Sequence, residues 1–221
     1  MKMTVKVWVT GLALGAMASP ANAIQSFIGG EAGWASYPRY TSQADQAAIN
    51  GGFTSSATSQ DKMGTALGIY GGQWLTENLG WETGYTDLGY VNGATIATAP
   101  PASSARINYK FSTTALYASL LGGTQLGKGT LYGKLGIYQA SVKYEESVTN
   151  IFAATFTPIS ATDSGTGLLV GAGYSRPLQE HLTAKIDLSF YNKVKFHQVY
   201  QVTGTNSGNI YKLSVGMAYV F

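Results

Sequence analysis

The end of the chain alternates strictly between large apolar side chains and small or polar ones. Because successive side chains of a strand point to opposite faces, this segment predicts a strand with one apolar face and one narrow, partly polar face. A strand of this kind needs an apolar solvent on one side, as in a lipid-facing β-barrel. The apolar positions are Leu213, Val215, Met217, Tyr219 and Phe221, and the inner ones are Lys212, Ser214, Gly216 and Ala218.

The composition supports a membrane environment. Charged residues make up 11% of the chain, less than half of the roughly 25% that is usual in soluble domains. A secreted soluble sandwich is the alternative, but its outer face would have to be polar. After Ile24 no apolar stretch reaches the ~18 residues of a spanning helix, so only a closed barrel can pair every backbone group in lipid. The chain has no cysteine, which excludes disulfides, thiolate metal sites and a catalytic thiol.

The amino terminus reads as an export signal. Lys2 and Lys6 precede a short apolar stretch, and Ala21-Asn22-Ala23 follows as a cleavage site. We therefore expect a signal peptide over residues 1–23 and a barrel domain over residues 24–221. Cleavage removes two of the 14 basic residues and lowers the formal net charge from +3 to about +1, so nucleic-acid binding loses its compositional support.

Eight alternating segments follow the signal sequence, and their connections alternate in length. Residues 75–78, 122–129 and 176–181 form short turns, whereas 38–61, 89–106 and 145–164 are long and polar. Short periplasmic turns and long outer loops are typical of outer-membrane barrels. The sequence thus predicts an all-β fold, an eight-stranded antiparallel up-and-down transmembrane β-barrel. Its segments are 26–37, 62–74, 79–87, 107–121, 130–144, 165–175, 182–200 and the C-terminal strand.

Five ionisable residues fall on the inward face of these strands: Glu31, Glu82, Lys134, Lys185 and Asp187. Each follows soon after its strand leaves the periplasmic side, so the five should share one level. An eight-stranded barrel is only wide enough for its side chains to fill. Two interpretations stay open, a structural network of ion pairs with trapped water and a gate that opens by exchanging partners.

Several of these strands resemble a known family. The hairpin of residues 71–89, with Gly80-Trp81-Glu82-Thr83-Gly84-Tyr85, is similar to the second and third strands of OmpA-like transmembrane domains, and residues 132–136, 184–188 and 219–221 are similar to later strands. The resemblance implies a barrel in a Gram-negative outer membrane, inserted by machinery that recognises the C-terminal aromatic residues Tyr219 and Phe221. It also places Glu82 among the family's interior acids and Lys134 and Lys185 among its interior bases. Because the chain stops at Phe221, we expect no cell-wall-binding domain and a closer relation to small adhesion, virulence and colonisation barrels.

The third long connection carries more apolar residues than a solvated loop needs: Ile151, Phe152, Phe156 and Ile159. Either its strands extend upward and pair there, or these residues meet a partner or lipid. Near the outer rim, Lys143, Lys193 and Lys195 could contact lipopolysaccharide phosphates.

The sequence contains no clear pattern of a catalytic, phosphate-binding or metal-binding site. The two histidines, His181 and His197, have no serine and acid at a useful spacing. The glycine-rich residues 165–171 lie within a strand and lack the helix of a phosphate loop. No cluster has metal-ligand spacing, so we expect no catalytic residue, metal or cofactor.

The predicted function is that of an integral barrel with a filled interior and exposed loops, serving envelope integrity, surface adhesion or host colonisation. A narrow channel for small solutes or apolar molecules is the alternative, and a lipid-acting enzyme comes third. The expected partners are membrane lipid, lipopolysaccharide, the barrel-insertion machinery and a host or surface ligand of the loops, with no nucleic acid. We expect a monomer.

Overall fold

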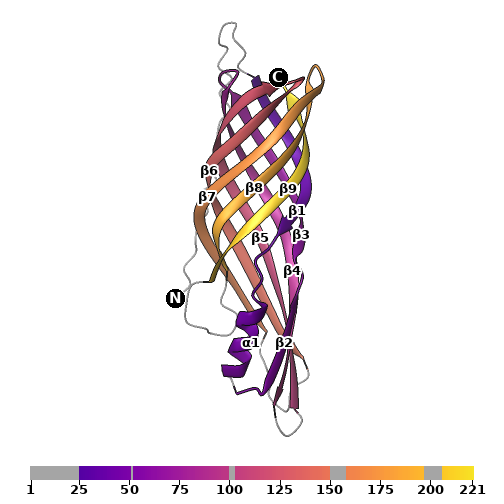
Figure 1. Cartoon of the computed structure of the whole chain (residues 1–221), viewed down its shortest axis with the longest axis vertical. Coiled ribbons are helices and arrows are strands. Elements are labelled where there is room, and N and C mark those ends of the chain that lie inside the picture. Colours follow the sequence, from indigo (N-terminus) through magenta and orange to yellow (C-terminus); the bar gives the residue numbers. More distant parts are fainter. Residues whose placement is uncertain (1–24, 51, 100–102, 150–157, 197–205) are drawn as a thin grey trace.

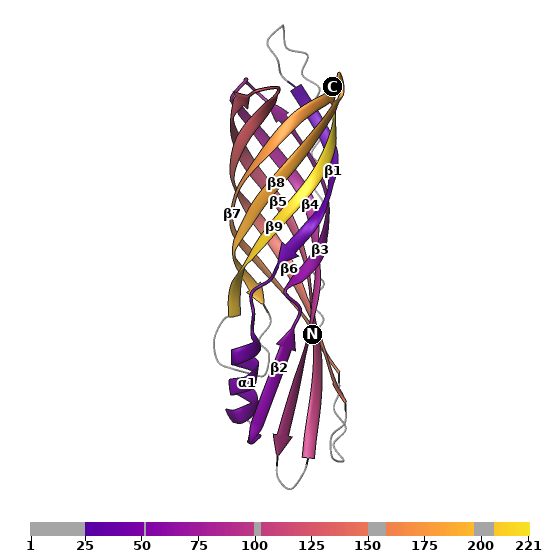
Figure 2. The same cartoon turned by 45° about the vertical axis from the view of Figure 1, so that its right-hand side comes forward.

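The strands form one antiparallel sheet that closes into a ring of eight, as predicted (Figures 1 and 2). The computed structural model describes residues 25–50, 52–99, 103–149, 158–196 and 206–221. The predicted signal peptide lies outside these residues. The ring strands are β1 (Gln25–Ser36), β3 (Met63–Trp74), β4 (Leu79–Ala99), β5 (Ser103–Leu126), β6 (Gly129–Thr149), β7 (Ile159–Gln179), β8 (Leu182–Phe196) and β9 (Asn206–Val220).

Each ring strand pairs with its neighbours in the chain, and β1 also pairs with β9 to close the ring. Two large outward side chains, Ile69 and Ile137, are 67% and 65% exposed, whereas inward Tyr70 and Tyr138 are buried. The alternation therefore sorts the sequence into an apolar outer wall and a filled interior, because period-two patterning places neighbouring residues on opposite faces.

The short turns gather at one end of the ring with the C-terminus (Figure 1). Residues 75–78 form one of them, as predicted. The other two are shorter than expected, because β5 and β7 run on to Leu126 and Gln179. Gly127, at a φ of +63°, and Lys128 join β5 to β6, which fits a type II′ hairpin turn whose first central residue is glycine.

At the opposite, long-loop end, β4, β5, β6 and β7 extend beyond the other ring strands. Most of the loops predicted at this end are therefore wrong. Most of 89–106 is strand, because β4 reaches Ala99 and β5 starts at Ser103. The pairing of β6 with β7 likewise reaches Glu146 and Ile159, so the strands of the third connection do extend upward.

The first long connection, 38–61, contains α1 (Thr41–Asn50) and β2 (Ser55–Gln60), neither of which was predicted. β2 pairs with the outer part of β4 and lies outside the ring. Ala44 and Ala48, one helical turn apart, are buried, and Asp45 accepts hydrogen bonds from Ser56 and Thr58 at 2.9 and 2.7 Å. Among the described residues, no helix is long and apolar enough to cross a membrane.

Candidate functional site

The charged side chains meet in the middle of the barrel. Glu31 comes from β1, Glu82 from β4, Lys134 from β6, and Lys185 and Asp187 from β8. All five are at most 8% exposed. The structure thus brings together every residue of the interior cluster expected from the sequence.

Two lysines each lie between two carboxylates. Lys134 Nζ is 2.8 Å from Asp187 Oδ1 and 3.5 Å from Glu82 Oε1. Lys185 Nζ is 3.0 Å from Glu82 Oε2 and 3.7 Å from Glu31 Oε2. Because each lysine bridges two acids, the ion pairs form one connected chain across the interior.

Hydroxyl groups complete the hydrogen bonding of the carboxylates, as buried charges require. Tyr117 donates to Glu82 at 2.9 Å, and Tyr132 donates to Asp187 at 3.0 Å. The ammonium group of Lys185 also lies 3.2 Å from the centroid of the Tyr70 ring, a cation–π contact.

Lys212 is the member that the sequence prediction omitted. Its ammonium group contacts Glu31 Oε1, and Ser214 donates to Glu31 Oε2 at 3.0 Å. Lys212 is 1% exposed, and it balances the network at three acids and three lysines. The signal was present, because alternation in the C-terminal strand already places Lys212 and Ser214 on the inward face.

Glycines make room for these side chains. A Cβ atom at Gly171 would lie 2.7 Å from Lys134 Cε, and one at Gly68 would lie 3.0 Å from Glu31 Oε1. The small residues on β3 and β7 therefore face the long charged ones, so that the layer is filled without overlap.

A second layer, which the sequence did not predict, fills the barrel toward the long-loop end. We call it the aromatic layer, and its rings belong to Tyr37, Tyr40, Phe111, Tyr144 and Phe196. Phe111 packs edge-on against Phe196, with centroids 5.6 Å apart, and lies 5.1 Å from Tyr144. Tyr37 donates to the carbonyl of Gly89 at 2.9 Å.

On the short-turn side, a cavity of about 100 Å³ lies next to the charge network. Phe27, Trp74 and Tyr132 line it together with Glu82 and Lys185. The cavity reaches the ion pairs from this side, and the aromatic layer lies on their other side.

The remaining predicted residues lie away from the interior. Tyr219 and Phe221 are exposed on the outer wall, with ring centroids 6.0 Å apart. Ile159 begins β7 and is 50% exposed, whereas Ile151, Phe152 and Phe156 lie outside the described residues.

Of the two histidines, the structure describes His181. His181 stacks on Tyr219 with centroids 5.4 Å apart, and its Nδ1 lies 3.0 Å from the carbonyl of Val220. His197 lies outside the described residues. In the described part of the chain, no group of three His, Cys, Asp or Glu residues could hold a metal ion.

A closed ring with an apolar wall and a charged, filled centre defines a β-barrel of the bacterial outer membrane. The sequence model of the OmpA-like transmembrane domain family matches residues 21–221. The chain belongs to this family.

Solved structures with a similar fold come from several bacteria. Ail of Yersinia pestis is 13% identical, with a TM-score of 0.47 over 91% of this chain and 100% of that one. OprG of Pseudomonas aeruginosa is 15% identical, with a TM-score of 0.46 over 90% and 97%. The neisserial surface protein NspA is 12% identical, with a TM-score of 0.44 over 89% and 97%. No curated protein sequence matches the chain.

Proposed function

We propose that this chain is a closed, non-enzymatic outer-membrane barrel that works through its extracellular end, in surface attachment, host colonisation or envelope integrity. The observation that supports this proposal is the filling of the interior at two levels. The charge network holds three acids and three lysines in contact, and the aromatic layer packs beside it. A barrel filled in this way is better suited to displaying a surface than to passing solutes.

The extracellular end offers a structured surface for such a role. β4 to β7 rise beyond the other strands, β2 adds to β4, and α1 packs beside β2 (Figure 2). Surface loops on a rigid scaffold are common sites of binding. The partner that we infer is a host or surface ligand that meets residues 151–159, whose apolar members are Ile151, Phe152, Phe156 and Ile159.

Cell attachment tests this proposal. Residues 151–157 would be replaced by an equally long Gly/Ser segment, and bacteria expressing the protein would be counted on cultured epithelial cells. The matched control replaces residues 100–102, between β4 and β5, in the same way. We expect attachment to fall to about the level of cells without the protein for the first variant only. Unchanged attachment, with both variants folded by heat-modifiable gel mobility, would contradict an adhesive role of this segment.

A narrow channel is the second candidate, because each bridging lysine already has two partners. Lys185 lies between Glu31 and Glu82, so an exchange of partners needs only a small movement. Conductance in planar lipid bilayers separates the two candidates. A closed barrel stays silent both as wild type and as Glu82→Ala, whereas a steady conductance that changes in Glu82→Ala would favour the channel.

A further inference from the structure

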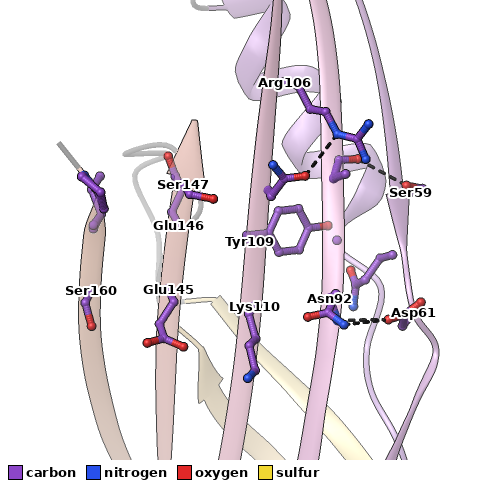
Figure 3. A pocket seen from close by; sticks show the side chains of 16 residues that line it. Ser59, Asp61, Asn92, Arg106, Tyr109, Lys110, Glu145, Glu146, Ser147 and Ser160 are labelled. Carbon is purple, nitrogen blue, oxygen red and sulfur yellow. Dashed lines mark hydrogen bonds between the residues drawn. The ribbon is translucent and has the colours of Figure 1, made fainter. Parts of the chain in front are cut away.

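The outer face of the extracellular sheet contains a polar cleft of about 730 Å³ (Figure 3). We call it the wall cleft. Five strands or their ends contribute to it: β2, β4, β5, β6 and the start of β7. Its polar side chains include Asp61, Asn92, Arg106, Asn108, Lys110 and Glu145.

Strand register arranges these side chains in rows across the sheet. In one row, Lys110 is the partner of Asn92 on one side and of Glu145 on the other. In the next row, Asn108 lies between Ala94 and Ser147. Such rows present hydrogen-bonding groups at the regular spacing of a sheet, about 5 Å between strands.

The height of the wall cleft above the membrane follows from the outer face of β5. Leu116, 55% exposed, is the last large apolar residue on this face of β5. Lys110 lies six residues earlier in the chain, on the extracellular side of Leu116, about 20 Å along the strand and about 14 Å higher at a tilt of 45°. The polar interface of a bilayer adds only about 5–8 Å on each side. The cleft therefore lies above the headgroups, at the side of the protein.

The lining of the wall cleft carries no excess of positive charge. Its basic residues are Arg106 and Lys110, and its acidic ones are Asp61, Glu145 and Glu146. Lys143, beside the cleft, contacts Glu145 at 2.6 Å. The hydrogen bond from Lys143 lowers the pKa of Glu145, so this carboxylate remains ionised in mildly acidic surroundings. A phosphate cluster would favour a surplus of arginine and lysine, which the cleft does not have.

Local contacts hold several of these groups in place before any ligand arrives. Arg106 donates to Asn108 at 3.2 Å, and Asn92 donates to Asp61 at 3.3 Å (Figure 3). Lys110 lies over the ring of Tyr90, 4.3 Å from its centroid. Side chains that are already ordered lose less entropy on binding.

We infer that the wall cleft binds the saccharide chain of the lipopolysaccharide that surrounds the barrel, above its lipid phosphates. Amides, hydroxyls and paired charges suit a ligand rich in hydroxyl groups. The cleft lies on the same outer face of the strands as the lipid-facing residues, but further from the membrane. The saccharide chains of adjacent lipopolysaccharide molecules are therefore the groups that lie beside it. The inference does not rest on the attachment role proposed for residues 151–159, although Pro158 and Ile159 also line the cleft.

Titration of the folded protein tests this inference. Wild-type protein in phospholipid nanodiscs without lipopolysaccharide would be titrated with core oligosaccharide released from rough lipopolysaccharide, and followed by saturation-transfer NMR. Asn108→Trp and Ser147→Trp fill the cleft from neighbouring strands. Ser104→Trp is the matched control, because Ser104 is exposed on β5 outside the cleft lining.

We expect saturable binding to wild type and Ser104→Trp, and at least about a fivefold loss of affinity in the two cleft variants, which is close to 1 kcal/mol. Binding should change little with salt, because a ligand held through phosphates would lose affinity steeply. Absence of binding, equal binding by all four proteins, or a steep loss with salt would overturn the inference. Cleft-dependent binding of a sialylated host-type oligosaccharide, in place of the core oligosaccharide, would overturn the assigned source.

Discussion

Glu31 contacts the ammonium groups of Lys212 and Lys185 where all three side chains are at most 6% exposed. Removing its charge leaves Lys212 buried without its carboxylate. We expect Glu31→Gln to lower the free energy of unfolding by about 3–5 kcal/mol, the range for breaking a buried pair. Urea titration of the protein in phospholipid vesicles would measure it.

Two further variants give the matched controls for that prediction. Glu145→Gln breaks the exposed pair with Lys143, and we expect little or no loss of stability, because solvent screens such a pair. The double variant Glu31→Gln with Lys212→Met should regain much of the lost stability, because no unpaired charge remains. Similar losses for Glu31→Gln and Glu145→Gln would contradict the structural importance of the interior network.

Two glycines of β1 differ in the space around them. A Cβ atom at Gly33 would lie 2.0 Å from the carbonyl oxygen of Leu213 in the partner strand, whereas at Gly30 the nearest atom is 3.7 Å away. We expect Gly33→Ala to destabilise the barrel by about 1–3 kcal/mol through overpacking, while Gly30→Ala stays neutral or gains about 0.5–1 kcal/mol. The same urea titration measures both, and equal stabilities would contradict the close approach of β1 to β9.

The interior position of five of the six residues of the charge network could be predicted from the sequence, because a charged side chain on the inward face of a barrel strand must lie inside the barrel. Their pairing does not follow, since it depends on which side chains lean toward one another across the ring. The aromatic layer follows from the sequence only in part. Alternation places Phe111 on the inward face together with Tyr117, whereas Phe196 points inward only because the pairing register shifts between Tyr191 and Val194.

At the scale of elements, Tyr40, directly before α1, anchors the start of the helix to the aromatic layer. The Tyr40 ring packs against Phe196 and Phe111, with centroids 5.3 and 6.0 Å away. We expect Tyr40→Ser to speed amide hydrogen exchange in residues 41–50 by about tenfold or more, because the helix is too short to be stable alone. Exchange in the ring strands should stay the same.

Ile49→Ser is the control for the Tyr40 variant, because Ile49 lies on α1 and is 42% exposed. We expect wild-type exchange rates in this variant. Equal acceleration by both variants would mean that composition, and not docking through Tyr40, limits the helix.

The ring strands were predictable because lipid on one side and a filled centre on the other impose a period of two. Above the membrane this constraint ends. There many outward residues of β4, β5 and β6 are polar, as at Asn92, Lys110 and Glu145, so the composition of a strand resembles that of a loop. α1 and β2 were missed for the same reason, since neither has an apolar face broad enough to appear as a pattern.

At the scale of the whole molecule, the apolar wall defines how deep the barrel sits in lipid. Leu135 is 61% exposed near the middle of the apolar wall on β6, and Ser141 follows on the same outer face nearer the extracellular end. We expect Leu135→Arg to destabilise folding in vesicles by about 2–4 kcal/mol and Ser141→Arg by at most about 1 kcal/mol. A reversed order, measured by urea titration, would mean that the membrane covers a different part of the strands.

The contact between Glu31 and Lys212 joins the first ring strand to the last, 181 positions apart in the chain. Until β1 and β9 pair, a nascent barrel carries the carboxylate of Glu31 on one edge strand and the ammonium group of Lys212 on the other. Pairing of the two strands brings these charges into contact and closes the barrel in the same step. The opposite charges on β1 and β9 thus favour one pairing register for the final closure. A wrong register would leave Glu31 and Lys212 without their partners.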